Sequence, residues 1–301
     1  MSRRYLVMLL LLAAIWGSSF MFIKVAVKEL TPADVVLGRV FVGAVALLPA
    51  LPLVLGWRAL LAELRRFALP FVLLALANVV VPFWLLAWSE KRLDSGLAAV
   101  LQASMPLFTA LLALMFNRAQ GVRGARLVGV LLGFVGVVFL VGTRPSGDVL
   151  SALAVLLTAF CYAASALYAG ARLRDASPIA ISFVTLAIAT LVSLPLGIAQ
   201  LPAHVPSWKA LGSVVALGSL GLSVAYLLYY ALITRAGASY AALVTYLVPA
   251  LALGYGAAFL GEGVTVAAIV GLVLILIGVA LGTGVVRPQR PRRAEVTPIG
   301  G

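Results

Sequence analysis

The amino-acid sequence predicts an all-α polytopic membrane protein with ten transmembrane helices, arranged as two inverted five-helix repeats. Three observations lead to this fold class. Hydrophobic residues make up 64% of the chain and charged residues 10%, whereas soluble domains contain about 45–50% and about 25% respectively. Ten apolar stretches are each close to the ~20 residues that a helix needs to cross about 30 Å of hydrocarbon. The last five stretches also read as a diverged copy of the first five.

The ten stretches follow one another with short loops between them, so no soluble domain is expected. The first follows Arg3 and Arg4 as a signal peptide would, but its apolar run of about 20 residues has no small-residue cleavage site after it, so we expect it to be retained. The Thr31-Pro32 turn opens the second stretch. The fifth and tenth carry glycines at short regular spacings, which suit close helix packing in a scaffold or a dimer seam. In order, the predicted helices span residues 5–27, 35–57, 67–89, 96–116, 126–142, 149–171, 178–199, 210–233, 239–260 and 265–286.

Matched prolines set the register of the predicted repeat. At an offset of 146 residues Pro32 aligns with Pro178, and further along an offset of 143 residues aligns Pro106 with Pro249. Because each half has an odd number of spans, the second half must enter the membrane from the opposite side, so the repeat is inverted. Inverted repeats bring a substrate site near the bilayer midplane, where the two halves meet. We expect the first repeat over residues 1–146, the second over 147–286 and a disordered cytoplasmic tail over 287–301.

The net charge of +13 is spread over alternate loops and forms no contiguous face, which argues against nucleic-acid binding. Of the 22 Lys and Arg residues, 15 fall on one predicted side of the membrane and five on the other. The positive-inside rule then places both termini in the cytoplasm, as in a protein of the bacterial inner membrane. Cys161 is the only cysteine and His204 the only histidine, so the sequence offers neither an intramolecular disulfide nor a metal site. No cofactor is expected.

Polar and aromatic side chains inside the apolar stretches mark a predicted substrate pathway, because polar groups in hydrocarbon usually face a cavity or a partner helix. In the sixth and eighth stretches they recur at helical spacing on one face. Asn78 and Gln102 are the most polar uncharged groups at depth, and Trp16 lies near mid-span, aligned with Tyr162 in the repeat. The alternative is that hydroxyls bond across helix contacts and rings pack in the core. The predicted substrate-binding residues are Trp16, Ser19, Asn78, Gln102, Tyr162, Ser165, Ser223, Tyr226, Tyr230, Thr245 and Tyr246.

Three prolines within the stretches, Pro82, Pro106 and Pro249, are predicted hinges. Each removes a backbone donor and frees a carbonyl one turn earlier, which kinks the helix. A static kink that serves packing is the alternative. Lys24 and Arg39 are the two cations well inside the stretches, and both are expected near the outer mouth. They either snorkel to the interface or turn inward to receive a substrate carboxylate.

Acidic residues are expected in or near loops throughout, Glu90 among them. A proton antiporter normally needs a membrane-embedded carboxylate, so the sequence favours a facilitator or a weakly coupled carrier. A membrane-embedded enzyme would need an acidic cluster for magnesium, a metal-binding His set or a nucleophile with its base. The chain is therefore predicted not to be an enzyme, and a non-transporting scaffold subunit stays open as an alternative.

A family resemblance rests on motifs that occur in a fixed order: Ala14-Ile15-Trp16-Gly17-Ser18-Ser19-Phe20, Thr31-Pro32, Ala238-Ser239-Tyr240-Ala241-Ala242, Pro249 and Leu260-Gly261-Glu262. Together they resemble the EamA branch of the drug/metabolite transporter superfamily, and within it the YddG-type amino-acid exporters. The resemblance implies ten helices, an inverted repeat and alternating access, with transport of amino acids or other small metabolites. The first half departs from the pattern, because Asn117-Arg118-Ala119 stands where the second half has Leu260-Gly261-Glu262. This puts a functional role for Glu262 in doubt and favours one in closing a helix end.

The sequence thus predicts a secondary transporter that exports small amphipathic metabolites, amino acids foremost, by alternating access at a central cavity between the repeats. A multidrug carrier, or a nucleoside or sugar carrier of the same superfamily, is the alternative. The expected partners are the small-molecule substrate and the lipid bilayer, with the protein either a monomer or a homodimer.

Overall fold

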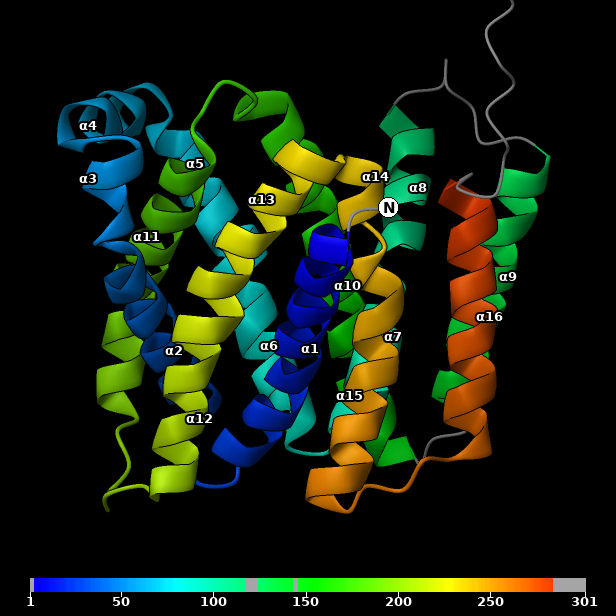
Figure 1. The fold of residues 1–301 in the computed structure, drawn as a ribbon. Helices are drawn as coiled ribbons and strands as arrows, with labels where there is room; N and C mark the ends of the chain where they lie inside the picture. Colours follow the sequence, from blue (N-terminus) through cyan, green and yellow to red (C-terminus); the bar gives the residue numbers. More distant parts are fainter. Residues whose placement is uncertain (1–2, 117–123, 143–145, 284–301) are drawn as a thin grey trace, which may run out of the picture.

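The computed structural model describes residues 3–116, 124–142 and 146–283. These segments form a bundle of helices that run side by side (Figure 1), and they contain no β-strand. We call the end of the bundle at which α1 begins, the upper end in Figure 1, the N-terminal face, and the other end the opposite face. In the first half the helices are α1 (Arg3–Ala26), α2 (Pro32–Leu47), α3 (Ala50–Val54), α4 (Trp57–Arg66), α5 (Ala68–Ala75), η1 (Leu76–Val80), α6 (Val81–Glu90), α7 (Ser95–Gln102), α8 (Met105–Phe116) and α9 (Ala125–Gly142). In the second half they are α10 (Ser146–Arg172), α11 (Pro178–Ala199), α12 (Trp208–Gly218), η3 (Ser219–Val224), α13 (Ala225–Ala236), α14 (Ala238–Ala241), α15 (Val244–Leu260) and α16 (Val266–Thr283).

The prediction of an all-helical membrane protein is confirmed. Within the described residues, each predicted apolar stretch lies mainly on one helix or on a run of consecutive helices. Six of these segments are long and apolar enough to cross a membrane, and shorter apolar helices cover residues 126–142, 244–260 and 266–282. The predicted tail over 287–301 and the Asn117-Arg118-Ala119 segment lie outside the described residues.

The second predicted helix is interrupted, and an additional helix follows it. Thr31 and Asp34 form a reciprocal capping box with Pro32 at the first helical position, so α2 begins sharply. The helix ends at Leu47, and α3 follows around Pro49. Gly56 has φ +80°, a conformation that favours glycine, and the chain turns there into the amphipathic α4. The apolar run alone gave no sign of this surface helix.

Two π-helical turns interrupt the third and eighth apolar stretches at matching positions. η1 begins at Leu76 and η3 at Ser219, which are 143 residues apart, the same offset that aligns Pro106 with Pro249. A π turn inserts one extra residue and leaves backbone carbonyls poorly paired, and such turns often occur at functional sites. Asn78 lies in η1 and Gly221 in η3, so both turns fall at mid-span.

Two of the three predicted proline hinges, Pro106 and Pro249, differ in local structure. Between α7 and α8 the helix breaks at Ala103 and Ser104, just before Pro106. By contrast, α15 continues through Pro249, and its interruption lies earlier, between α14 and α15. The two prolines therefore occupy matched sequence positions but dissimilar backbone.

Glycines bring α9 and α16 into backbone contact at one side of the bundle (Figure 1). A Cβ atom added at Gly278 would lie 2.5 Å from the Cα of Gly133, and one added at Gly129 would lie 2.6 Å from the backbone nitrogen of Gly282. Of the two uses that the sequence suggests for these glycines, the structure has the scaffold contact, formed within the chain.

Candidate functional site

A cavity of about 480 Å³ lies at the centre of the bundle. This volume is within the range of about 300–1,000 Å³ that is typical of small-molecule sites. Both halves of the chain line it: α1, α2 and the segments from α5 to α8 on one side, and α10, α11, α13 and α15 with η3 on the other. Most of the lining is apolar, with a few polar groups that converge on the interior.

The cavity gathers most of the side chains that the sequence singles out. Nine of the predicted substrate-binding residues line it, namely Trp16, Ser19, Asn78, Gln102, Tyr162, Ser165, Tyr226, Tyr230 and Thr245. Pro106, Pro249 and Arg39 line it as well. Their meeting follows from the helical stripes, because residues three or four apart on one helix share a face.

Four of the predicted site residues do not line the cavity, namely Ser223, Tyr246, Pro82 and Lys24. Ser223 lies in η3 and donates its hydroxyl to the carbonyl oxygen of Gly43 on α2, at 2.9 Å. The π turn breaks the 3.6-residue periodicity, so the serine leaves the face that Tyr226 keeps. Tyr246 packs against the main apolar core, and Pro82 is buried.

Trp16 joins the two halves across the cavity. Its indole nitrogen donates to the carbonyl oxygen of Gly221 in η3, at 3.2 Å, and its ring lies 5.4 Å from the ring of Tyr229. The π turn thus supplies an acceptor that a regular helix would use internally. Tyr229 and Gly221 line the cavity, although neither is among the predicted substrate-binding residues. The repeat gives a signal for Gly221, because this residue aligns with Asn78 at the offset of 143 residues.

Arg39 lies inside the cavity and not at an outer mouth. The side chain is only 5% exposed, and its guanidinium carbon lies 3.7 Å from the centre of the Phe83 ring. Stacking of this kind stabilises a desolvated guanidinium. Its Nε has no hydrogen-bond partner, and among the described residues no carboxylate pairs with it within 4.0 Å. The expectation that Arg39 sits near the mouth is therefore corrected.

Lys24 turns inward and is fully engaged by the backbone. Its Nζ donates to the carbonyl oxygens of Glu90 at 2.7 Å and Leu93 at 2.8 Å. These carbonyls follow the end of α6, where helix carbonyls lack intrahelical donors and a cation is favourable. Lys24 does not line the cavity, and it holds α1 to the loop between α6 and α7.

Glu90 differs from the expectation for acidic residues. It does stand at a helix end, as the last residue of α6, but its side chain is 0% exposed. Neither carboxylate oxygen has a hydrogen-bond partner in the described structure. Its burial depends on packing between α1, α6 and α7, which the sequence around Glu90 does not reveal.

The exposure of the lining residues differs between the two ends of the cavity. Lining residues nearer the N-terminal face remain partly exposed, as Met105, Ile181 and Thr245 do. At the other end, Ile23 and Leu86 are buried. The side chains of the largest apolar core cluster fill that end, so the cavity has a floor there.

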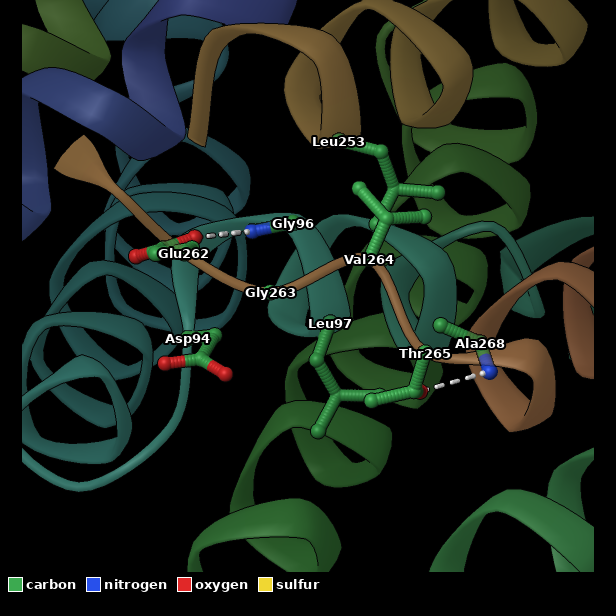
Figure 2. Close-up of a pocket in the computed structure, with 9 residues that line it drawn as sticks. All are labelled: Asp94, Gly96, Leu97, Leu253, Glu262, Gly263, Val264, Thr265 and Ala268. Carbon is green, nitrogen blue, oxygen red and sulfur yellow. Dashed lines mark hydrogen bonds between the residues drawn. The ribbon is translucent and has the colours of Figure 1, made fainter. Parts of the chain in front are cut away.

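Glu262 ties the chain after α15 to the start of α7. Its carboxylate accepts hydrogen bonds from the backbone nitrogen of Ser95 at 2.9 Å, the hydroxyl of Ser95 at 2.8 Å and the backbone nitrogen of Gly96 at 3.2 Å. Figure 2 shows Glu262 pointing at Gly96, beside a pocket whose volume of about 10 Å³ has room for about one water and is too small for a substrate. A carboxylate at a helix N-terminus satisfies unpaired donors and interacts favourably with the dipole. The helix end that Glu262 caps is that of α7, far away in sequence.

Comparisons with known proteins agree on one family. Residues 3–142 and 149–283 match the EamA-like transporter family. An "Uncharacterized transporter" of Archaeoglobus fulgidus is 25% identical over 279 residues, which cover 91% of this chain and 96% of that protein. The "Uncharacterized inner membrane transporter YedA" of Escherichia coli K12 is 28% identical, with 89% of this chain and 87% of that protein covered. A crystal structure with 18% sequence identity superposes with a TM-score of 0.66 over 95% of this chain and 98% of that one, and this likeness shows the fold alone.

Proposed function

Because the chain belongs to the EamA-like transporter family, we propose that this membrane transporter is a secondary carrier that exports a small amphipathic metabolite, foremost an amino acid, by alternating access. The observation that carries the proposal is the central cavity, which both halves line and whose lining is partly exposed toward the N-terminal face but buried toward the opposite face. A carrier needs a site that faces one side at a time, and this difference in exposure supports one of the two states required.

We further propose ten membrane spans in two inverted repeats, over residues 1–146 and 147–286. The π turns support this division, because they recur at the offset that also aligns Pro106 with Pro249. The likeness of Trp16 and Tyr162, which line one cavity from the two halves, supports it too. Substrate contacts are proposed for the nine predicted residues that line the cavity. Hinge roles are proposed for Pro82, Pro106 and Pro249.

The positive-inside rule, applied to the loop charges, favours a cytoplasmic N-terminal face. On that proposal the cavity of this structure faces the cytoplasm, where an exporter loads its substrate. No Asp or Glu lines the cavity within the described residues, which favours a facilitator or a weakly coupled carrier over a tightly proton-coupled pump.

Counterflow in proteoliposomes tests the proposal. Vesicles loaded with an unlabelled compound are given the same compound with a label, for a panel of amino acids, nucleosides, sugars and cationic drugs. We expect accumulation of at least one amino acid above the level in protein-free vesicles. Accumulation of nucleosides, sugars or drugs alone would leave a carrier of another substrate class, and no accumulation of any compound would favour the scaffold alternative.

A further inference from the structure

We infer that the cavity holds its substrate by an organic carboxylate that pairs with Arg39, and that the site requires this acid group and not an ammonium group. The inference rests on the proposed function and narrows its substrate to amphipathic carboxylates. Amino acids belong to this class, and so do analogues that lack the amine, whereas amines that lack the acid do not.

The state of Arg39 carries the argument. Arg39 is only 5% exposed, a ring covers one face of its guanidinium, and no carboxylate of the described chain pairs with it within 4.0 Å. The buried Glu90 acts on it electrostatically only from beyond that distance. Burial of an unpaired ion is unfavourable, and a ligand that brings the opposite charge offsets that cost. Because Arg39 lines the cavity, a ligand there can reach it.

The chemistry of a guanidinium selects the partner. Its planar set of donors matches the two oxygens of a carboxylate, and charge-assisted hydrogen bonds of this kind are the strong ones. The hydroxyl groups of Tyr162 and Tyr226 lie within electrostatic reach of Arg39 and line the same cavity. Phenol hydroxyls can donate to a bound carboxylate as well. The acid group of a ligand therefore meets donors on more than one helix.

The remaining lining fits an apolar body and offers no anion for an amine. Trp16, Tyr229 and Phe20 line the cavity beside apolar side chains, so an aromatic or aliphatic substituent is accommodated. The amide of Gln102 and the hydroxyl of Ser165 are buried without partners, and they can accept a hydrogen bond from an ammonium group without attracting its charge strongly. A zwitterion is thus tolerated, and a lone cation is repelled by Arg39.

Two carboxylates, on α6 and α2, are candidates for a counter-charge within the protein, and neither forms a close pair with Arg39. Glu90 acts on Arg39 electrostatically, but it is buried beside Lys24 and does not line the cavity. Asp34 accepts hydrogen bonds from the backbone nitrogen and the hydroxyl of Thr31 in the capping box that begins α2. Neither approaches Arg39 to within 4.0 Å.

The test uses three compounds with the same ring and chain length: phenylalanine, 3-phenylpropanoate and phenethylamine. Binding to the purified full chain is measured by thermal stabilisation and calorimetry, and counterflow is measured separately. The variants are Arg39→Gln, Arg39→Lys and, as a matched control, Lys28→Gln, which removes an exposed cation outside the cavity.

We expect phenylalanine and 3-phenylpropanoate to bind and phenethylamine not to bind. Arg39→Gln is expected to weaken binding of the two acids by about 10- to 100-fold, since it removes hydrogen bonds to a charged group. Arg39→Lys should weaken it by a smaller factor, because the charge stays but the planar donor set is lost. Lys28→Gln should bind like the wild type.

The outcomes separate the two proposals. Binding of phenethylamine at least as tight as that of 3-phenylpropanoate to the wild type, which needs no variant to fold, overturns the inference. Equal binding by Arg39→Gln and Lys28→Gln also overturns it, as does binding of none of the three compounds. Carboxylate binding that depends on Arg39, together with no counterflow of any panel compound, keeps the inference and removes the carrier proposal.

Discussion

The two faces of the bundle differ in the polar contacts that tie helices together. At the opposite face, Lys24 binds the carbonyls after α6, and Glu262 caps α7 with three hydrogen bonds. At the N-terminal face the described residues show the Arg66–Asp175 ion pair, at 3.5 Å with both side chains 66% exposed, and a hydrogen bond from the backbone of Ser177 to Glu63. Exposed ion pairs contribute little, about 0–1 kcal/mol.

The polar contacts at the opposite face are discrete hydrogen bonds between separate segments of the bundle, in addition to apolar packing. Such hydrogen bonds can break and reform as a set. The asymmetry also lies in the sequence, because Glu262 has its aligned position at Ala119 in the first half, a side chain that cannot accept hydrogen bonds. On the carrier proposal, opening toward the opposite face requires these contacts to release, so each can be tested by substitution.

The largest effect is expected from Glu262→Ala. It leaves three donors at the start of α7 without their charged acceptor, and we expect the free energy of unfolding to fall by about 2 kcal/mol. The matched control is Glu63→Ala at the N-terminal face, which removes one acceptor from Ser177 and should cost about 1 kcal/mol or less. Reversible unfolding in detergent measures both. Equal losses would mean that the two faces are held equally.

A somewhat smaller effect on stability is expected from Lys24→Met, with a clear effect on access. The substitution removes the donor to Glu90 and Leu93, at a cost of about 1–2 kcal/mol, and loosens the loop between α6 and α7. A reporter cysteine replaces Leu93, which is 1% exposed, in a Cys161→Ser background. We expect labelling by a membrane-impermeant thiol reagent to become several-fold faster. The exposed control Lys28→Met should leave the rate unchanged, and an equal rise in that control would contradict the role of Lys24.

Trp16→Phe tests the middle of the molecule, where the two faces meet. It removes the hydrogen bond to Gly221 but keeps an aromatic ring, so substrate binding should weaken by about 3- to 10-fold, equivalent to roughly 1 kcal/mol. Trp84→Phe is the matched control, because Trp84 is exposed on the bundle surface and does not line the cavity. Calorimetric titration with one ligand, 3-phenylpropanoate, measures the binding of both variants. An equal or larger loss of binding in the Trp84→Phe control would contradict a specific role for the Trp16 hydrogen bond.

The helices and much of the cavity can be predicted from the sequence because both follow from local periodicity. Long apolar runs have one stable solution in a bilayer, a helix with its backbone bonded internally. Stripes of polar residues identify inward faces, which is how Tyr162 and Tyr226 come to be predicted beside one cavity. The stripe fails at Ser223 because the π turn changes the period, and an apolar run carries no mark of such a turn.

Other features depend on contacts between distant parts of the chain. The partner of Glu262 lies 167 residues away, and no local pattern relates that glutamate to Ser95. The sequence of a helix also does not determine where a long cationic side chain on it points, since Lys24 and Arg39 could reach either an interface or the interior. The structure turns both inward and gives them unlike roles, one bound to carbonyls and the other without an anionic partner in the described chain.

The smallest effect is expected at Glu29 and Ser207, which join the loop after α1 to the start of α12 at the opposite face. The hydroxyl and backbone nitrogen of Ser207 both donate to the Glu29 carboxylate, and these bonds hold the pKa of Glu29 below its ordinary value of 4.5. A lowered folded-state pKa means that the contact stabilises the fold above pH 4.5 and that this contribution is lost as pH falls through the lower pKa. The difference in melting temperature between wild type and Glu29→Gln should therefore be constant near neutral pH and shrink in acid. Because the carboxylate is exposed to solvent, salt should reduce the difference as well. A difference that grows as the pH falls would contradict the contact.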